Sequence, residues 1–318
     1  MVINPTAGGG RVKKQWPEIV KPLIDEIGLD YDFEFTSYPH HAIEIAKQRV
    51  NEEYEIICAI GGDGTANEVL NGVLKADKKG VFAAIPLGTG DDIPTVFGIP
   101  EKDLDAAIQC LAYGKNLSFD IGYCVNADRY FAGAASMGFD AEVANRANRS
   151  GKQREGTRNY QIAIIETILK FKPYDLKITI DDQDPIQARR MLLAIGNGTR
   201  YGGGMHICPA ATVQDEIFHA TALKKVSRFT LLRIFPKIYD GEHVYHSKVD
   251  SFQGAKFLIE SVGKKCLYQV DGEILGFLPE TFITKPRGIT VRVPDPWVSY
   301  SEIWGKKLQL KGKKIPQY

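Results

Sequence analysis

The chain has 318 residues, of which 25% are charged, and its formal net charge is +1. This length allows two domains, because single hydrophobic cores stop growing near this size. The balanced charge argues against a nucleic-acid-binding protein. Five scattered cysteines without a CxxC pair argue against a disulfide framework or a zinc site. No secretory signal and no long apolar run is evident, so we expect a cytoplasmic protein rather than an integral membrane protein.

The first 122 residues alternate short apolar runs with helical patterns. The runs at 56–60 and 81–88 lack polar alternation and end at glycines, as buried parallel strands do. Helical spacing is present at 15–28, 42–50 and 65–74. These patterns predict an α/β domain with a parallel sheet, whose ligand loops follow the carboxyl ends of the strands.

From about Tyr123 the pattern changes to alternating apolar and polar residues, which is typical of antiparallel strands separated by turns. The segments with this alternation are 176–181, 188–196, 219–225, 255–261 and 281–293. One helical stretch, 159–171, interrupts them. We therefore predict a β-rich second domain, a sandwich.

The strongest local motif is Gly61-Gly62-Asp63-Gly64-Thr65, between a predicted buried strand and a predicted helix. Consecutive glycines let backbone N–H groups approach phosphate oxygens, and the helix places its positive end near the same point. A carboxylate in such a loop repels phosphates unless a divalent cation lies between them, which favours a Mg²⁺-nucleotide. In isolation the motif is equally consistent with a tight strand-to-helix turn.

Two further loops carry similar residues: NPTAGGG at 4–10 after the first strand, and PLGTGDD at 86–92 after the third. Loops that follow parallel strands converge on one edge of the sheet, so the three predict a common phosphate site. The chain has no GxxxxGK[ST] loop and no protein-kinase HRD or DFG motif. It also lacks a GxGxxG dinucleotide fingerprint after the first strand.

The set NPTAGGG, GGDGTANEVLNG and PLGTGDD resembles the diacylglycerol kinase catalytic domain family, which includes bacterial diacylglycerol kinases, sphingosine kinases and ceramide kinases. The segments at 120–144 and QVDGEILG at 269–276 agree with this resemblance and follow in the expected order. GGDGT alone is shared with NAD kinases, whereas the PLGTG-x-D loop combined with VDGE is more specific to the lipid kinases.

The resemblance implies a three-layer α/β nucleotide-binding domain followed by an antiparallel β-sandwich, with the active site between them. The domains are then expected at 1–122, with 295–318 returning to the first, and at 123–294. The implied reaction transfers a phosphoryl group from ATP, with Mg²⁺, to the hydroxyl of diacylglycerol or a similar lipid.

The resemblance also implies the site residues. The residues expected at the nucleotide are Asn4, Thr36, Gly61, Gly62, Asp63, Gly64, Thr65, Asn67, Glu68, Gly88 and Thr89. Glu273 matches the general base that would accept the proton of the substrate hydroxyl, while Asp271 shapes the turn before it. Asp63, Asp92 and Asp120 match an acidic network that organises Mg²⁺ and water.

A structural Mg²⁺ is implied in the second domain, at the Asp215 carboxylate with backbone carbonyls of Thr212 and Ile217. Two departures from the family pattern bear on the site. Glu216 stands where the family has glycine, which affects the turn that would hold this ion. In the PLGTGDD loop Asp91 replaces asparagine and Pro94 stiffens the following turn, so a catalytically weak member is one alternative.

The expected partner is a lipid at the membrane surface, with transient peripheral contact, no nucleic acid, and a homodimer left open. A basic run could approach anionic headgroups; it consists of Arg146, Arg149, Lys152, Arg154 and Arg158. The basic tail, with Lys306, Lys307, Lys311, Lys313 and Lys314, has the same two interpretations, as a docking element or as an ordinary solvated segment. The stretch from Gly202 to Met205 is a candidate wall of the acceptor pocket.

Two other functions remain as alternatives. GGDGT is compatible with an NAD kinase-like enzyme, although the PLGTG-x-D loop and the VDGE-bearing β domain argue against it. A non-catalytic nucleotide- or lipid-binding module is compatible with the altered loop at Asp91 and Pro94, whereas Glu273 and Asp63 argue for catalysis.

Overall fold

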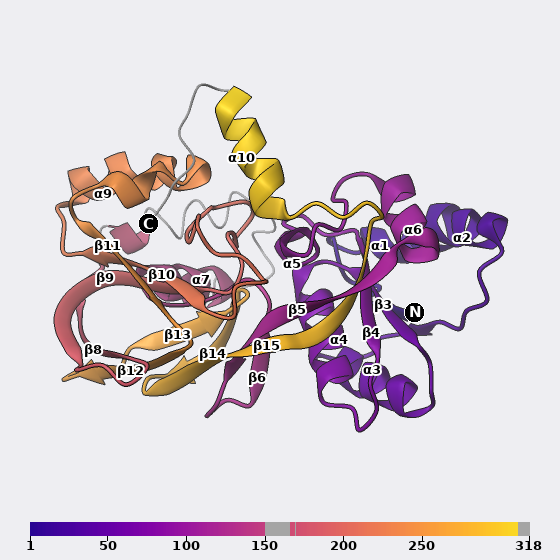
Figure 1. Cartoon of the computed structure of the whole chain (residues 1–318), viewed down its shortest axis with the longest axis horizontal. Coiled ribbons are helices and arrows are strands. Elements are labelled where there is room, and N and C mark those ends of the chain that lie inside the picture. Colours follow the sequence, from indigo (N-terminus) through magenta and orange to yellow (C-terminus); the bar gives the residue numbers. More distant parts are fainter. Residues whose placement is uncertain (150–165, 169, 311–318) are drawn as a thin grey trace. The chain divides into compact units, whose positions relative to one another are not determined.

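The computed structural model describes residues 1–149, 166–168 and 170–310, and the chain forms two compact units (Figure 1). Unit 1 contains Met1–Ile121 and Lys285–Trp304, and Gly122–Thr284 form the body of unit 2. The return to unit 1 thus starts at Lys285 rather than at residue 295 and ends at Trp304. It starts early because β15 (Glu280–Val293) is one continuous strand that pairs with β12 in its first half and with β4 in its second.

Unit 1 has the parallel sheet that its apolar runs predict. Its strands are β1 (Val2–Ile3), β2 (Glu34–Phe35), β3 (Ile56–Gly61) and β4 (Val81–Pro86). They lie in the order β2-β1-β3-β4, followed by β15, and all these pairs are parallel. The register pairs Ile3 with Ile60 and Gly61 with Pro86, so the strands end at one edge. β5 (Lys115–Cys124) pairs with β15 and leads into unit 2.

Helices cover both faces of this sheet (Figure 1). They are α1 (Arg11–Gln15), the π-helical turn η1 (Trp16–Val20), α2 (Lys21–Ile27), α3 (His41–Asn51), α4 (Asp63–Leu74), α5 (Asp92–Val96) and α6 (Leu104–Tyr113). On one face Trp16, Ile24 and Ile108 pack with Cys58 and Ile60 in a single buried cluster. On the other, α3 and α4 approach so closely that a Cβ on Gly72 would lie 2.6 Å from the Ala46 Cβ.

Unit 2 is the antiparallel β-sandwich domain. Its strands are β6 (Arg129–Phe131), β7 (Ala134–Gly138), β8 (Tyr174–Ile180), β9 (Ile186–Gly196), β10 (Phe218–Lys224), β11 (Val249–Gly254), β12 (Lys256–Val262), β13 (Leu267–Val270) and β14 (Glu273–Phe277). The order is β14-β13-β7-β9-β8-β12-β15, and β10 pairs with β9 and β11. Of the helix predicted at 159–171, only 166–168 and 170–171 lie within the described residues; 166–168 and 170 are helical.

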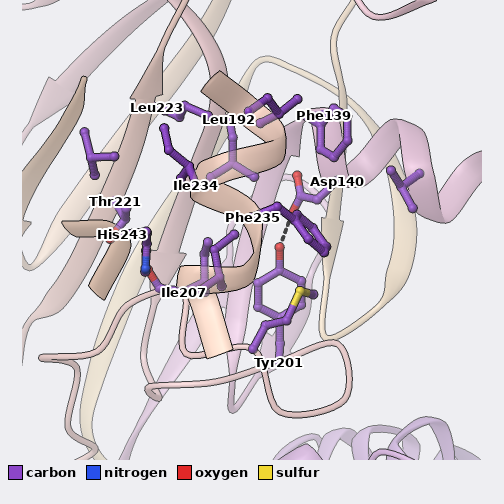
Figure 2. Close-up of a pocket in the computed structure, with 15 residues that line it drawn as sticks. Phe139, Asp140, Leu192, Tyr201, Ile207, Thr221, Leu223, Ile234, Phe235 and His243 are labelled. Carbon is purple, nitrogen blue, oxygen red and sulfur yellow. Dashed lines mark hydrogen bonds between the residues drawn. The ribbon is translucent and has the colours of Figure 1, made fainter. Parts of the chain in front are cut away.

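Short helices cover the face of β9 and β10 that points away from the sandwich core. They are α7 (Phe139–Arg149), α9 (Arg228–Ile234) and the 3₁₀ turns η2 (Phe235–Asp240) and η3 (Glu242–Tyr245). α9 starts at Ser227, whose hydroxyl accepts a hydrogen bond from the Thr230 N–H at 3.2 Å, as an N-cap does. Figure 2 shows Ile234 and Phe235 facing Leu192 and Phe139 across this layer.

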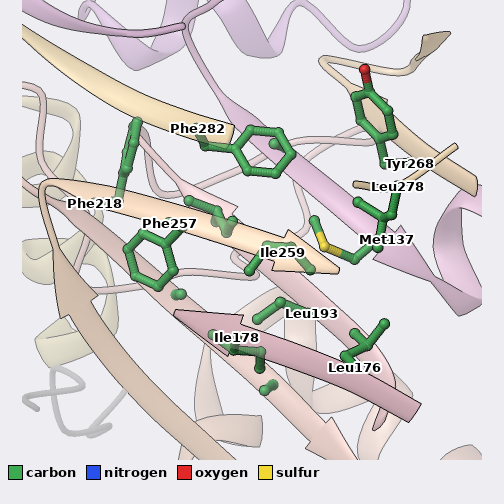
Figure 3. Close-up of a cluster of buried hydrophobic side chains, with 14 of the residues drawn as sticks. Met137, Leu176, Ile178, Leu193, Phe218, Phe257, Ile259, Tyr268, Leu278 and Phe282 are labelled. Atoms are coloured by element: carbon green, nitrogen blue, oxygen red, sulfur yellow. The ribbon is translucent and has the colours of Figure 1, made fainter. Parts of the chain in front are cut away.

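The sandwich core lies on the opposite face of these strands (Figure 3). Phe131, Phe218, Phe257 and Phe282 are fully buried there and contact one another through ring stacking and edge contacts. The alternating pattern of the second half predicts this arrangement, because every second side chain of a strand faces the same side. The final helix is α10 (Tyr300–Leu310), and among the described residues no helix has the length and apolar character that a bilayer crossing requires.

Candidate active site

The three glycine loops of unit 1 meet at the carboxyl edge of the sheet, as predicted. The Asn4 N–H donates to the Ile60 carbonyl at 3.1 Å, and the Leu87 N–H donates to the Gly61 carbonyl at 2.8 Å. The Asn4 side-chain amide also donates to the Thr65 hydroxyl at 3.0 Å, which ties the first loop to the start of α4. Backbone bonds and one side-chain bond therefore hold the three loops in register.

Glycine is required where the second and third loops cross. A Cβ on Gly88 would lie 2.6 Å from the Gly62 Cα, and a Cβ on Gly62 would lie 3.2 Å from the Gly88 Cα. Distances below 3.0 Å are not tolerated by ordinary side chains, so the two backbones can approach only without them. Gly64, in contrast, has nothing within 4 Å of the point that a Cβ would occupy. At the crossing, neither Gly62 nor Gly88 has a side chain that covers the backbone.

Asp63 joins the second loop to the third. Its Oδ1 accepts the Ile93 backbone N–H at 2.9 Å, so the carboxylate satisfies an N–H of the first turn of α5, which no carbonyl of that helix can reach. Asp92, the first residue of α5, is buried. Pro94 is the third residue of the helix, within the first turn, where a missing N–H costs nothing. The structure thus brings Asp63 and the start of α5 together and accommodates the proline.

Asp91 occupies an unusual position for a carboxylate. Its backbone is left-handed, with φ 49°, and its side chain is only 5% exposed. The Oδ1 atom accepts the Gly88 N–H at 3.0 Å, which closes the third loop. Burial raises the pKa of Asp91 to about 6, and the negative charges of Glu101 and Asp92 act in the same direction against the Gly88 bond.

Several residues predicted at the nucleotide also have structural partners. Glu68 accepts the N–H groups of His40 at 3.2 Å and Ala42 at 3.3 Å, and so caps α3. Asn67 is buried within α4 and accepts a bond from the Asn71 amide. Thr36 follows β2 at the same edge of the sheet, where its N–H donates to the Ile3 carbonyl at 2.8 Å. Thr89 is exposed on the third loop.

The third predicted acidic residue, Asp120, lies on β5 in unit 1. It is buried, and its Oδ1 accepts the Arg287 N–H of β15 at 2.8 Å. This bond links the two strands that run from one unit into the other. That the Asp120 carboxylate lies near Asp63 and Asp92 stays a prediction.

In unit 2 the two acids of the Asp271-Gly272-Glu273 turn have different hydrogen-bond partners. Asp271 accepts three backbone N–H groups, those of Ala132 at 2.9 Å, Gly133 at 3.0 Å and Ala134 at 3.1 Å. With φ 45° it also forms the left-handed corner between β13 and β14. Asp271 therefore builds the turn, which agrees with its predicted role.

Glu273 begins β14 and keeps 36% of its side chain exposed. Its Oε2 accepts a bond from Arg129 Nη2 at 2.6 Å, and the Arg129 side chain is only 9% exposed. A charge-assisted bond from a buried guanidinium fixes one carboxylate oxygen. Sequence reasoning missed Arg129, because no motif marks a residue of β6 as the neighbour of a residue 144 positions later.

His219 lies next to Asp215, the carboxylate that is predicted to bind a metal ion. Asp215 Oδ2 lies 2.7 Å from His219 Nε2, and Oδ1 lies 3.4 Å from the Ile217 N. Because the Gln253 amide donates to His219 Nδ1 at 3.3 Å, the Nε2 of His219 carries the proton and donates to Asp215. Glu216 adopts φ 66°, so the turn keeps the left-handed bend that a glycine would form.

Most of the predicted basic docking run, Lys152, Arg154 and Arg158, lies outside the described residues, as do Lys311, Lys313 and Lys314 of the tail. Arg146 and Arg149 belong to α7. The role of this run stays a prediction.

A small cavity of about 40 Å³ lies in unit 2 between the strands and their short helices (Figure 2). Side chains from α7, β9, β10, α9, η2 and β11 line it, among them Phe139, Leu192, Leu223, Ile234 and Phe235. Met205, at the end of the stretch expected to form an acceptor pocket, is part of the wall. The rest of the cavity was missed, because its residues are spread over more than a hundred positions without a motif.

Several polar side chains interrupt this apolar wall, among them Asp140 and His243. Asp140 is buried and accepts a bond from the Tyr201 hydroxyl (Figure 2); burial raises its pKa. His243 is buried, and its Nε2 donates to the Ile207 carbonyl at 3.0 Å. Burial lowers the pKa of His243 to about 4, so the ring is neutral, and its Nδ1 has no partner within the described residues. His243 therefore leaves one buried acceptor, its Nδ1, without a partner among the described residues.

Comparison with known proteins agrees with this architecture. Residues 1–124 match the family model of the diacylglycerol kinase catalytic domain, and residues 133–293 match that of the YegS C-terminal NAD kinase beta sandwich-like domain. A diacylglycerol kinase of Bacillus subtilis is 28% identical over 294 residues, 92% of this chain and 95% of that protein. One from Mycobacterium tuberculosis is 29% identical over 294 residues, 92% of this chain and 93% of that protein.

Solved structures share the fold at lower identity. A crystal structure from Bacillus anthracis str. Sterne has a TM-score of 0.76 at 20% identity and covers 93% of this chain and 97% of its own. An NAD kinase from Archaeoglobus fulgidus, in complex with ATP, has a TM-score of 0.53 at 12% identity and covers 96% of each chain. The α/β domain with its glycine loops and the β-sandwich define a kinase of this structural class. The chain belongs to the diacylglycerol kinase family of lipid kinases.

Proposed function

We propose that this protein transfers the γ-phosphoryl group of ATP, with Mg²⁺, to the hydroxyl of diacylglycerol or a closely similar lipid. The observation that carries the phosphoryl-transfer part is the crossing of Gly62 and Gly88 at the edge where three strands end. Backbone without side chains, next to the N-terminus of α4, suits an anion. Thr89 adds an exposed hydroxyl on the same loop.

The carboxylates of unit 1 fit a divalent cation by their chemistry. Asp63 sits at the N-terminus of α4 with one oxygen directed to Ile93, and a bound triphosphate would repel it without a counter-charge. Asp63, Asp92 and Asp120 would hold Mg²⁺ through oxygen ligands, and the ion would neutralise charge on the phosphates. The nucleotide assignment itself is supported by the ATP complex of the related NAD kinase structure.

Glu273 is the proposed general base. A carboxylate must accept the proton of the acceptor hydroxyl as the oxygen attacks phosphorus. The side chain is 36% exposed, and the bond from Arg129 to Oε2 fixes the orientation of the whole carboxylate. A base held by a buried arginine has a defined direction, and orientation is a large part of the catalysis of phosphoryl transfer.

The cavity of unit 2 is the proposed acyl-chain pocket. Its apolar lining suits a hydrocarbon chain, and ligand pockets with such a lining carry a few polar groups that fix orientation. The buried Nδ1 of His243 has no partner among the described residues, so a lipid that reached it would find an acceptor there for a hydroxyl. An acceptor such as NAD would gain nothing from such a lining, which favours a lipid over the NAD kinase alternative.

The test is transfer of radiolabelled phosphate from ATP to a panel of acceptors in mixed micelles: diacylglycerol, monoacylglycerol, phosphatidylglycerol, ceramide, and NAD in solution. We expect label in diacylglycerol or one other hydroxyl lipid, and none in NAD. Labelled NAD would contradict the lipid acceptor, and no transfer by the wild type would contradict the enzyme assignment.

Filling the cavity tests its role separately. Leu223→Trp adds bulk at a lining position, and we expect it to raise KM for a long-chain acceptor at least about fivefold while KM for ATP stays unchanged. A short-chain acceptor is the matched control, because it requires less of the cavity. An equal effect on both acceptors would contradict the acyl-pocket assignment.

A further inference from the structure

The short helical segment that roofs the cavity has a second, outward face. On α9, Leu231 and Ile234 point inward and line the cavity. Phe229 and Leu232, at the alternate helical positions, are 79% and 52% exposed. The adjoining turns η2 and η3 also carry exposed aromatic side chains, with Tyr239 47% and Tyr245 55% exposed. A helix with apolar side chains on both faces is not the amphipathic helix that a protein core on one side and water on the other require.

The fully exposed charged side chains of this segment are all basic. All of residues 225–248 lie in the described part of the chain, and within them the exposed side chains are basic, apolar or serine, with no acid. The exposed basic residues are Lys225, Arg228, Arg233, Lys237 and Lys248. The two acids of the segment, Asp240 and Glu242, are only partly exposed. The whole chain has a net charge of only +1, so the basic character is local.

A short helix with exposed Phe and Leu beside Arg and Lys is the composition of segments that lie in the membrane interface. The apolar side chains enter the boundary between headgroups and acyl chains, and the basic side chains are attracted to anionic headgroups. We propose that the outer face of α9, η2 and η3, with Phe229 and Leu232 at its centre, docks the protein onto an anionic lipid bilayer. This location differs from the basic run near Arg146 that the sequence suggested.

The position of this surface next to the cavity is a further argument for membrane docking. The same segment supplies Leu231, Ile234 and Phe235 to the cavity wall, so a bilayer on its outer face lies one helix thickness from the cavity. A lipid taken from that bilayer would reach the cavity without crossing open water. This consequence rests on the proposed acyl pocket, whereas the docking itself does not.

The test is sedimentation of the purified full chain with vesicles of phosphatidylcholine, with and without phosphatidylglycerol, in the absence of ATP. We expect binding to the anionic vesicles that weakens as salt is raised. Phe229→Ser combined with Leu232→Ser should lower the partition coefficient at least about tenfold. Arg233→Glu with Lys237→Glu should also lower it about tenfold, and only for anionic vesicles.

Matched control variants make the same kinds of change elsewhere on the chain. Tyr113→Ser removes a 66% exposed ring from unit 1, and Lys47→Glu with Lys79→Glu reverses two exposed charges there. Neither control should change vesicle binding, and all variants should unfold at the wild-type temperature because the changed side chains are exposed. The proposal would be overturned if the wild-type protein did not bind the vesicles, or if only the control variants reduced binding.

Two further readouts separate this surface from the kinase function and from self-association. The Phe229→Ser, Leu232→Ser variant should keep wild-type activity on a short-chain diacylglycerol in solution and lose it on vesicles. Loss on both acceptors would overturn docking as the role of this face. Light scattering should show the same oligomeric state for both proteins; a dimer that this variant dissociates would assign the face to a second copy and overturn the proposal. Vesicle binding without any kinase activity would support docking and refute the proposed function.

Discussion

The glycine-loop edge of unit 1 and the cavity of unit 2 are built in opposite ways. The edge consists of short loops that follow consecutive parallel strands, and its key contacts are backbone atoms at Gly62 and Gly88. The cavity consists of apolar side chains from strands and helices that are far apart in the sequence. The proposed phosphate site needs particular residues at particular points, whereas the proposed acyl pocket needs only shape and low polarity. The two regions therefore differ in how visible they are in the sequence.

Within three residues, the Asp271-Gly272-Glu273 turn contains one carboxylate that binds backbone groups and one that binds a side chain. The carboxylate of Asp271 accepts three backbone N–H groups, whereas Glu273 accepts its bond from the Arg129 side chain and stays 36% exposed. Neighbouring acids in one motif can thus be separated by their partners. Variants in this turn and in the two units test both contrasts.

The largest expected effect is that of Glu273→Gln. The amide cannot accept the proton of the acceptor hydroxyl, so kcat should fall about a hundredfold to ten-thousandfold while KM for ATP stays near wild type. Steady-state kinetics with the best acceptor measure both constants. Because Glu273 is partly exposed, the melting temperature should change little, and an active Glu273→Gln enzyme would remove Glu273 from the mechanism.

Asp271→Asn should damage the fold rather than the chemistry. The amide cannot accept all three backbone bonds, and one buried N–H would face an NH₂ group, at a cost of about 2–4 kcal/mol. Urea unfolding should show this loss. Residual activity per folded molecule should exceed that of Glu273→Gln, and the reverse order would break the separation of roles within the turn.

Gly88→Ala should destabilise unit 1, and Gly64→Ala should not. The new Cβ at 88 would lie 2.5 Å from Asp91 Oδ1 and 2.6 Å from the Gly62 Cα, and overpacking of this kind costs about 1–3 kcal/mol. Gly64 lies in α4 with open space around it, so alanine there should leave the free energy of unfolding equal or higher. If Gly64→Ala nevertheless raises KM for ATP, the phosphates approach the backbone at that point. Equal stability of the two variants would contradict the backbone crossing.

Asp91→Asn should stabilise the protein at neutral pH. The folded-state pKa of about 6 is above the ordinary value of 3.8. The stability of the fold is therefore undiminished below about pH 4, where Asp91 is protonated in both states, and falls as pH rises through about 6, where the buried carboxyl must ionise. Asparagine keeps the acceptor for Gly88, tolerates positive φ and carries no buried charge. We expect a gain of about 1–2 kcal/mol at pH 7.5 that disappears near pH 4. Thermal melts of both proteins across this range measure it, and a gain independent of pH would contradict the burial argument.

The smallest effect concerns the proposed structural Mg²⁺ in unit 2. His219 holds Asp215 Oδ2, and the expected ligands are Oδ1 and the carbonyls of Thr212 and Ile217. Mg²⁺ at about ten times its dissociation constant should stabilise the EDTA-treated protein by about 1.4 kcal/mol. Asp215→Asn should abolish this response without changing KM for ATP. An EDTA-treated wild type that does not respond to Mg²⁺ would mean that the Asp215–His219 bond holds this turn without an ion.

Much of unit 1 could be predicted, because its signals are local. Apolar runs at β3 and β4, each followed by glycines, indicate buried parallel strands, and parallel strands bring their following loops together. The return strand was placed too late, since the continuity of β15 depends on its pairing with two different partners, β12 and β4.

The residues that were missed have only tertiary signals. Arg129 is 144 positions from the glutamate it holds, and His243 is an ordinary residue of a polar segment until burial removes its charge. Glu68, which is expected at the nucleotide, has a second role that no motif indicates: it caps α3, because helix packing brings His40 and Ala42 to it. The outer face of α9 is similar, since Phe229 and Leu231 are equally apolar in sequence and differ only in which side the strands cover.

The amino-acid sequence alone determined the order of the two domains, the three glycine loops and the family, because glycines, strand patterns and short polar motifs act locally. Only the tertiary structure decided which carboxylate builds a turn and which stays exposed, where the apolar cavity lies and which side of its roof faces outward. Those properties depend on burial and on hydrogen bonds between distant positions, and neither exists until the chain has folded.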